Sequence, residues 1–222
     1  NRVYHQEEYK LIEPYLKELD PNDKIIDAGC GLGDWVLALK NKGFNICGID
    51  ISKKTIDKLK ENMPEISFRR EDIRKTTFMD SEFDIYFSWG VFEHFEDGPQ
   101  KCLLEANRIL KKKGLIFLSV PFDNIRQSLE SNMGDIINIS SNQRFYQYRF
   151  SKSEFSRELN KAGFKLILME PIHKKQGTLR MLHHNFGFHY DWLITKIIAY
   201  LVAPLIPSIF ISHMLFAAAI KK

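Results

Sequence analysis

The stretch KIIDAGCGLGDWVLALKNKG spans residues 24–43 and reads as a strand, a glycine-rich turn and a helix. The apolar start at 24–29 is typical of a buried strand, and the helical pattern over 34–43 ends at a glycine. Between them stand Gly29, Gly31 and Gly33, whose missing Cβ lets the backbone turn tightly and approach a ligand. The helix start offers free N–H groups and a positive dipole end. The stretch therefore predicts a ligand-binding strand–turn–helix unit.

The same alternation continues along the chain. Apolar runs at 44–50, 66–72, 83–89 and 115–121 predict strands. Helices are predicted after Ser52, a suitable N-cap, and over 100–114, where the last turn is basic and a glycine follows. Repeated units of this length imply a parallel sheet with helices on both faces, a Rossmann-like α/β three-layer sandwich. Its ligand crevice lies at the carboxyl ends of the strands, which are followed by the loops after residues 28, 49, 71 and 88.

The rest of the chain extends this domain. Helices are predicted over 5–19 and over 151–164, where Ser151 and Glu154 form a capping box. Apolar runs at 164–171 and 213–222 predict a sixth and a seventh strand. The polar stretch 122–143 has no clear periodicity, and we interpret it as a lid or substrate loop. We expect a single domain over residues 1–222, with a helical cap-like insertion at about 172–212.

The spacing of the glycines separates two classes of cofactor site. A dinucleotide site usually reads GxGxxG, whereas here the third glycine comes one place earlier and Asp27 precedes Gly29 by two places. This pattern resembles motif I of the class I S-adenosylmethionine-dependent methyltransferases, and the resemblance covers essentially the whole chain. It implies a seven-stranded, mostly parallel sheet with a reversed final strand. It also implies S-adenosylmethionine as cofactor and S-adenosylhomocysteine as product.

The resemblance assigns roles around motif I. In that family, the acidic residue and the glycines of the motif cradle the methionyl part of the cofactor. They correspond here to Asp27, Gly29, Gly31 and Gly33. The second strand ends in an acidic residue that binds the ribose hydroxyls, and Asp50 matches it. A carboxylate can accept two hydroxyl hydrogen bonds, and such charge-assisted bonds are the stronger kind.

Further roles fall after the second, third and fourth strands. An aspartate after the third strand meets the adenine amino group in the family, and Asp72 matches it, with Ile73 beside the ring. Ile51 is expected to complete the apolar adenine slot. The loop after the fourth strand lines the sulfonium side of the cofactor. Its counterparts here are Ser88, Trp89 and Gly90.

The acceptor is expected to be a small molecule. The segment WGVFEHFED at 89–97 resembles the one after strand four in small-molecule members of the family. Its His94 is either a general base or a packing residue below the cofactor loop, and we favour packing. Tyr146, Tyr148 and Arg149 are candidates for the acceptor pocket or for core aromatic positions. The acceptor atom (oxygen, nitrogen or carbon) and any catalytic residue stay open.

Composition limits the partners. The net charge is +4, and the Lys and Arg residues are scattered rather than clustered, which argues against nucleic acid. The three cysteines are widely spaced without CxxC, which is typical of free thiols in a reducing cytoplasm. The chain opens without a signal-peptide pattern, so we expect a cytoplasmic protein. The histidines between 173 and 189 lack ligand spacing, so no metal is expected. The oligomeric state stays open.

The segment WLITKIIAYLVAPLIPSIFIS at 192–212 carries a single charge, Lys196. Its length approaches the roughly 20 apolar residues of a membrane span, but Pro204 and Pro207 interrupt it. We expect a helical cap that roofs the substrate pocket, which suggests an acceptor with an apolar portion. The cap is expected to bury Trp192, Ile197, Leu201, Leu205 and Phe210. A dimer surface and a membrane-lying patch are less favoured alternatives.

Two other functions fit parts of the pattern. An NAD(P)-dependent oxidoreductase shares the strand–turn–helix unit, but the glycine spacing and the terminal pair of strands disfavour it. A non-catalytic cofactor-binding or interaction module would use the apolar segment as its docking surface. The complete set of residues from Asp27 to Asp72 argues against such a module.

Overall fold

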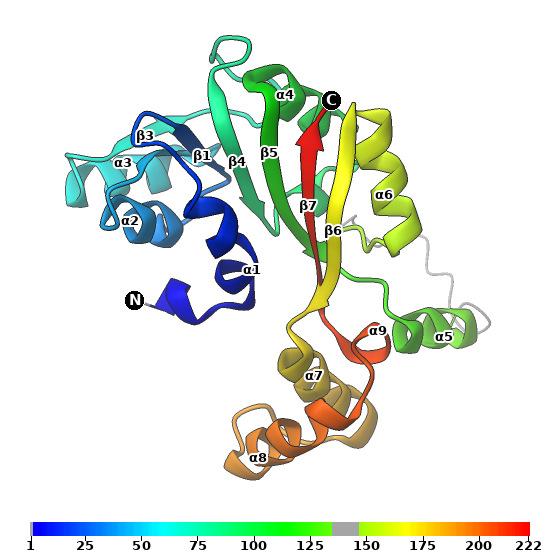
Figure 1. Cartoon of the computed structure of the whole chain (residues 1–222). Helices are drawn as coiled ribbons and strands as arrows, with labels where there is room; N and C mark the ends of the chain where they lie inside the picture. The colour runs from blue at the N-terminus through cyan, green and yellow to red at the C-terminus, as the bar shows by residue number, and fades with distance from the viewer. Residues whose placement is uncertain (1, 135–146) are drawn as a thin grey trace.

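A computed structural model describes residues 2–134 and 147–222, and within them one seven-stranded sheet has the order β3-β2-β1-β4-β5-β7-β6 (Figure 1). Strands β1 to β5 pair in parallel, whereas β7 runs antiparallel to both β5 and β6. This confirms the predicted Rossmann-like sheet with a reversed final strand. The strands are β1 (Lys24–Ala28), β2 (Asn45–Asp50), β3 (Ser67–Arg70), β4 (Phe83–Trp89), β5 (Leu110–Pro121), β6 (Phe164–Ile172) and β7 (Met214–Lys221).

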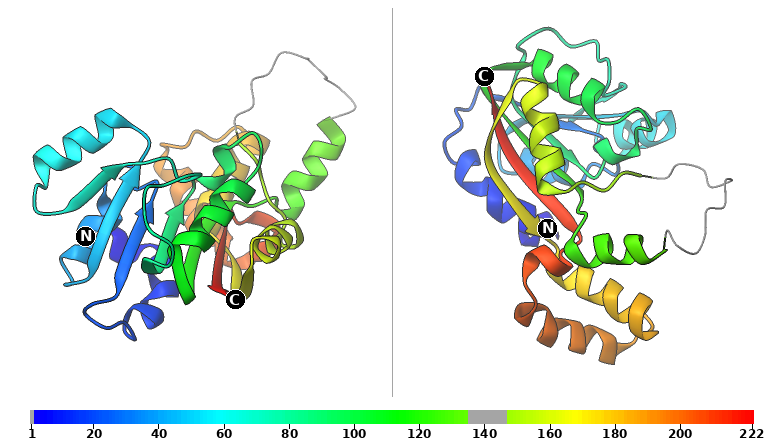
Figure 2. Two further views of the ribbon diagram at one scale, coloured as in Figure 1. Left: turned by 90° about the horizontal axis from the view of Figure 1, so that it is seen from above. Right: turned by 90° about the vertical axis from the view of Figure 1, so that its right-hand side faces the viewer.

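Helices cover both faces of the sheet, as the right-hand view of Figure 2 shows for α1 on one side and for α4 and α6 on the other. The first face carries α1 (Glu7–Leu16), α2 (Asp34–Lys40) and α3 (Lys53–Asn62), and the second carries α4 (Gln100–Ile109) and α6 (Lys152–Lys161). Neighbouring strand residues point to opposite faces, so Ile25 packs in one core and Ile26 in the other. Both cores are therefore built on one two-sided sheet.

The boundary between α4 and β5 differs from the prediction. Helix α4 ends at Ile109, and β5 begins at the next residue, so the predicted helix over 100–114 is wrong in its last turn. The carbonyl groups of Arg108 and Ile109 accept the N–H groups of Ser81 and Glu82, at 2.9 and 2.7 Å. These partners lie before β4, so a contact remote in sequence ends the helix. The basic run at 111–113 lies in β5 instead.

The polar stretch 122–143 is only partly described. Its first half forms helix α5 (Ile125–Gly134), where a loop was predicted. The side chain of Asn124 accepts the N–H of Gln127 at 3.1 Å, which is the hydrogen bond of an N-cap. Residues 135–143 lie outside the described residues.

Four short helices fill the chain between β6 and β7. They are α7 (Lys174–Phe186), α8 (Leu193–Val202), η3 (Ala203–Leu205) and α9 (Ser208–Ile211), and Figure 1 shows them beyond the end of the sheet where β5 finishes. Gly177 lets α7 pack directly against the backbone of α9. A Cβ at this position would lie 1.7 Å from the carbonyl oxygen of Ile211 and would clash with it. Within the described residues, no helix is both long and apolar enough to cross a bilayer.

The predicted burial of the apolar segment is wrong. Helix α8 buries Thr195 and Ala199, and its larger side chains point the other way. Leu201 is 63% exposed and Leu205 is 82% exposed. Trp192 and Ile197 are exposed too, and only Phe210 of the five predicted residues is half-buried. The small residues of α8 face the protein, so a large apolar surface is left in contact with solvent.

Candidate functional site

The turn after β1 is built on glycines in the left-handed region. Gly29, Gly31 and Gly33 have φ values of 84°, 50° and 76°, which side chains with a Cβ rarely adopt. A Cβ on Gly29 would lie 2.5 Å from Val91 Cγ2, in the loop after β4. Gly31 has no described atom within 4 Å of its Cβ position, so its backbone is open on that side. The turn thus presents bare backbone at the carboxyl end of the sheet.

Asp50 is held at the end of β2 by two backbone groups. Its Oδ2 accepts the N–H of Gly31 at 3.1 Å, and its Oδ1 accepts the N–H of Ser52 at 2.8 Å. Each carboxylate oxygen keeps a further lone pair, because an ionised carboxylate offers about four acceptor sites. The carboxylate is therefore fixed in direction, and it can still accept hydrogen bonds from two hydroxyl groups of a ligand.

A slot of about 290 Å³ opens beside Asp50. It brings together residues from the loops after β1, β2, β3 and β4, as parallel strands ending at one edge should. Most of its wall is apolar, with two aspartates among the lining residues. The lining consists of Gly29, Asp50, Ile51, Asp72, Ile73, Gly90, Val91, His94 and Phe95.

Asp72 is fixed by Arg74. The guanidinium Nη2 lies 2.6 Å from Asp72 Oδ2, and the backbone N–H of Arg74 donates to Oδ1 at 2.9 Å. These hydrogen bonds hold the pKa of Asp72 below its usual value. The same guanidinium lies 4.9 Å from the ring centroid of Phe95, another residue of the slot. Asp72 is thus an ionised acceptor in a position fixed by its neighbour.

Asp27 is a buried carboxyl group at the end of β1. It is 2% exposed, and its Oδ1 has no hydrogen-bond partner among the described residues. Burial, followed by the negative charge of Asp50, raises the pKa of Asp27 to about 7. An unpaired buried carboxylate is unfavourable, so this position suits a ligand that brings a cation or a donor.

The end of β4, Ser88 and Trp89, and the next residue, Gly90, divide between two roles. The hydroxyl of Ser88 is buried and donates to the carbonyl of Ala28 at 2.7 Å, so it joins β4 to β1 and does not line the slot. The ring of Trp89 lies 4.8 Å from that of Trp35, centroid to centroid. Gly90 lines both the slot and a second cavity, so the two spaces share a wall. Gly31 and Gly33 are absent from the described lining of the slot.

Two further cavities follow: the first shares Gly90 with the slot, and the second shares residues with the first. The tryptophan cavity, of about 350 Å³, is lined by Gln6, Glu8, Trp35, Trp89, Gly90, Ser119, His173, Gln176, His213 and Met214. The arginine cavity, of about 390 Å³, is lined by Glu93, Pro121, Gln147, Arg149, Arg180, His213 and Met214. His213 and Met214 belong to both. The slot and the two cavities therefore form a continuous series along the carboxyl end of the sheet.

Glu93 is a functional candidate that the sequence analysis passed over in favour of its neighbour. It lies in the short helix η2 (Phe92–His94), is 3% exposed, and its Oε2 has no partner among the described residues. Burial raises the pKa of Glu93 to about 7. His94 instead lines the slot, with its Nε2 4.0 Å from Glu93 Oε1. The available signal was an acidic residue inside the apolar run GVFEHF.

Two residues of the aromatic segment before α6 are described. Arg149 lines the arginine cavity and also a hollow beside Pro99. Tyr148 lines only the hollow beside Pro99, and its hydroxyl donates to the carbonyl of Glu96 at 2.6 Å. Tyr146 lies outside the described residues.

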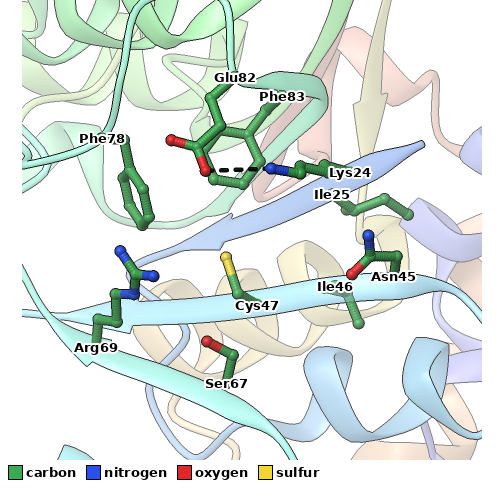
Figure 3. Close-up of a pocket in the computed structure, with 10 residues that line it drawn as sticks. All are labelled: Lys24, Ile25, Asn45, Ile46, Cys47, Ser67, Arg69, Phe78, Glu82 and Phe83. Atoms are coloured by element: carbon green, nitrogen blue, oxygen red, sulfur yellow. Dashed lines mark hydrogen bonds and ion pairs between the residues drawn. The ribbon is translucent and has the colours of Figure 1, made fainter. Parts of the chain in front are cut away.

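Another hollow, of about 200 Å³, lies at the opposite end of the sheet (Figure 3). Its walls include Lys24, Asn45 and Ser67, which are the first residues of β1, β2 and β3. Lys24 Nζ lies 3.4 Å from Glu82 Oε1 across it. In open parallel sheets, ligands bind at the carboxyl ends of the strands, so this hollow is a poor candidate for the active site.

The sequence of this chain is similar to those of known methyltransferases. A family model described as a methyltransferase domain matches residues 4–168. The chain is 28% identical over 185 residues to a ubiquinone/menaquinone biosynthesis C-methyltransferase of Campylobacter jejuni, covering 71% of this chain and 76% of that protein. It is 26% identical over 156 residues to a ubiquinone biosynthesis O-methyltransferase of Coxiella burnetii, covering 67% of this chain and 66% of that protein.

The fold has solved counterparts. An S-adenosylmethionine-dependent methyltransferase of Methanosarcina mazei superposes with a TM-score of 0.66 at 17% identity, over 96% of this chain and 97% of that one. At this identity the similarity shows the fold alone.

Substituting Asp27→Asn tests the cost of its burial. The unfolded carboxyl ionises near pH 4 and the folded one near pH 7, so the wild type loses stability as pH rises through this window. The free energy of unfolding of Asp27→Asn, relative to wild type, should rise by up to about 1.4 kcal/mol per pH unit between pH 4 and 7. Urea unfolding without ligand at pH 5 and pH 8 measures this. Asp57→Asn, on exposed α3, should show little pH-dependent difference. A gap that is equal at both pH values for Asp27→Asn would contradict the assignment.

Proposed function

Since this chain belongs to the methyltransferase domain family and is an S-adenosylmethionine-dependent enzyme, we propose that it methylates a small molecule bound in the tryptophan and arginine cavities. The observation that carries this proposal is the shared wall at Gly90. This residue lines both the slot that suits the cofactor and the tryptophan cavity. Because the chain belongs to this family, the alternative of an NAD(P)-dependent oxidoreductase is rejected.

The slot fits the adenosine part of the cofactor. Asp50, held by two backbone N–H groups, accepts from the ribose hydroxyls. Ile51 and Ile73 provide apolar walls for the adenine ring, and Asp72 is the acceptor for its amino edge. Apolar walls with a few placed acceptors are the usual composition of such sites.

The glycine turn fits the charged end of the cofactor. The bare backbone at Gly29, Gly31 and Gly33 leaves room for the methionyl chain. Asp27, buried and lacking a partner for Oδ1, is the counter-charge for its ammonium group. Trp89 and Gly90 adjoin the sulfonium side, and Ser88 holds this loop from behind through Ala28. When bound, S-adenosylmethionine supplies a methyl group that its sulfonium already activates.

The cavities fit an acceptor with both apolar and polar parts. Trp35, Trp89 and Met214 give the tryptophan cavity apolar walls, which support an acceptor with an apolar portion. Because the methyl group is activated, the main task of the protein is to hold the acceptor atom in line and to exclude water. Glu93, in the lining of the arginine cavity, adds a proton acceptor. A carboxyl group with a pKa of about 7 is suited to act as a general base.

Calorimetric titration tests the cofactor half of the proposal. S-adenosylhomocysteine should bind in roughly the micromolar range, with no comparable heat from NAD. Asp50→Ala should weaken this binding by about 2–3 kcal/mol, the scale of lost charge-assisted hydrogen bonds. Asp57→Ala, on the exposed face of α3, is the matched control and should bind normally. Unchanged affinity in a folded Asp50→Ala protein would place the ribose contact elsewhere.

Methyl transfer as a function of pH tests Glu93. The acceptor panel should include ubiquinone and menaquinone precursors, because the relatives are named for those pathways. With an acceptor that turns over, kcat/KM should rise with pH and level off above about pH 7, where Glu93 is ionised. Glu93→Gln should lower the rate by about 10²-fold or more and flatten the rise. An unchanged profile in Glu93→Gln would exclude Glu93 as the base.

A further inference from the structure

Two arginines line the arginine cavity. Arg149, just before α6, and Arg180, on α7, both line it. Among the described residues, neither guanidinium has a carboxylate within ion-pair distance. Arg149 donates instead to Oε1 of Gln127, at 2.7 Å. Lys and Arg side chains that point outward are solvated, but these two are half-buried and line the same cavity.

The other titratable groups of the cavity do not neutralise this pair. The nearby Asp123 acts on Arg149 only at longer range, and its carboxylate accepts from Ser128 at 3.0 Å. Glu93 is the one carboxyl group among the described lining residues, and even when it ionises above about pH 7 the two guanidinium charges outnumber it. Burial and the two arginines lower the pKa of His213 to about 4, so the imidazole is neutral and its Nδ1 has no partner among the described residues. The cavity therefore carries an excess of positive charge.

We propose that Arg149 and Arg180 bind a carboxylate or phosphate group of the methyl acceptor. This inference rests on the proposed function, because the arginine cavity joins the tryptophan cavity at His213 and Met214, and the tryptophan cavity joins the slot at Gly90. The planar guanidinium forms paired, charge-assisted hydrogen bonds with both oxyanions. The acceptor is therefore an anionic small molecule, bound by its charged group on the α7 side with its reacting atom toward Gly90.

Anion titrations of the enzyme saturated with S-adenosylhomocysteine test this site. Inorganic phosphate and benzoate are the probes, and at least one should bind saturably. Arg180→Gln should weaken that binding by about tenfold or more, the scale of a lost charge-assisted pair. Arg157→Gln, an exposed arginine of α6, is the matched control and should bind as wild type does. A short-chain phosphatidate below its micelle concentration is a third probe, and tighter binding than phosphate would identify a lipid-borne group.

Two results would overturn the anion site: no saturable binding of any probe by wild type, or equal binding by wild type and Arg180→Gln. S-adenosylhomocysteine affinity, measured on the same samples, reports the proposed function separately. If the cofactor binds and the anions do not, only the anion site fails.

A second inference concerns the exposed side of the insertion. We define the α8 apolar face as the large apolar side chains that α8 and the following turns present to solvent. Contiguous exposed apolar surface of this kind marks an interaction site in soluble proteins. The face consists of Trp192, Leu193, Ile194, Ile197, Tyr200, Leu201, Leu205 and Ile209.

Lysines border this face. Lys174 Nζ donates to the carbonyl of Pro204 at 3.3 Å, and Lys175 Nζ lies 4.3 Å from the ring centroid of Tyr200. Lys196 is exposed on α8 itself. Residues 192–222 contain no Asp or Glu. Asp191, beside Trp192, is the acidic neighbour of the face, and its side chain is 84% exposed. Apolar side chains with Trp and Tyr among them, bordered by more lysines than carboxylates, have the composition of a helix that lies in a membrane interface.

The alternative occupants fit less well. Helix α8 has ten residues and ends before Pro204, too short to span a bilayer. A second copy joined about a two-fold axis would bring the lysines of one face close to those of the other, which is repulsive. A bilayer with anionic lipid complements both the apolar side chains and the charge.

We infer that the α8 apolar face docks on the surface of an anionic lipid bilayer, with α8 in the plane of the interface. Flotation with vesicles tests this. The wild type should bind vesicles of phosphatidylcholine with phosphatidylglycerol more tightly than phosphatidylcholine alone. Leu201→Glu should weaken binding by about tenfold or more, and Lys175→Glu should do so only on the anionic vesicles. Leu104→Glu is the matched control, because Leu104 is 54% exposed on α4, and it should bind normally.

Circular dichroism and S-adenosylhomocysteine binding establish that each variant is folded. Wild-type protein that stays unbound with anionic vesicles would overturn this inference, as would equal binding by Leu201→Glu. Sedimentation that shows a dimer abolished by Leu201→Glu, without vesicle binding, would instead assign the face to a second copy.

Discussion

The carbonyl oxygen of Ile49 accepts two backbone hydrogen bonds, from Gly29 at 2.8 Å and from Cys30 at 2.9 Å. These bonds join the turn after β1 to the end of β2 and force the chain into the left-handed region at Gly29. The next N–H, from Gly31, then points at Asp50 and fixes its carboxylate. The slot depends on this arrangement, because Gly29 must also pass within contact distance of Val91. Any residue with a Cβ at position 29 would separate the loops after β1 and β4.

Much of this could be predicted from the sequence, because its causes are local. Three glycines in five residues after an apolar run determine the turn, and the positions of Asp50 and Asp72 follow from where their strands end. Ser88 could not be placed in the same way, because a one-residue difference in a strand reverses the direction of a side chain. Its hydroxyl points back to Ala28 instead of into the slot.

The features that sequence reasoning missed depend on contacts between distant segments. The end of α4 is set by hydrogen bonds from Ser81 and Glu82, which no helical periodicity reveals. Glu93 is buried where a segment remote in sequence meets η2, with the N–H of Tyr148 donating to the carbonyl of Glu93 at 2.9 Å. In α8, apolar residues occur nearly all round the helix, so composition alone does not say which side faces the protein. The small residues Thr195 and Ala199 decide it, because they permit the closest approach.

The insertion that carries α7 to α9 leaves and rejoins the sheet at one paired position. Ile172, the last residue of β6, is the register partner of Met214, the first residue of β7. A short turn between these two residues would close the same antiparallel hairpin, so the sheet does not need any particular length of chain there. The segment can therefore vary in length without disturbing the slot. The residues that α7 supplies to the two cavities can therefore change independently of those that line the slot, because a fold can keep one site while the segment beside it varies.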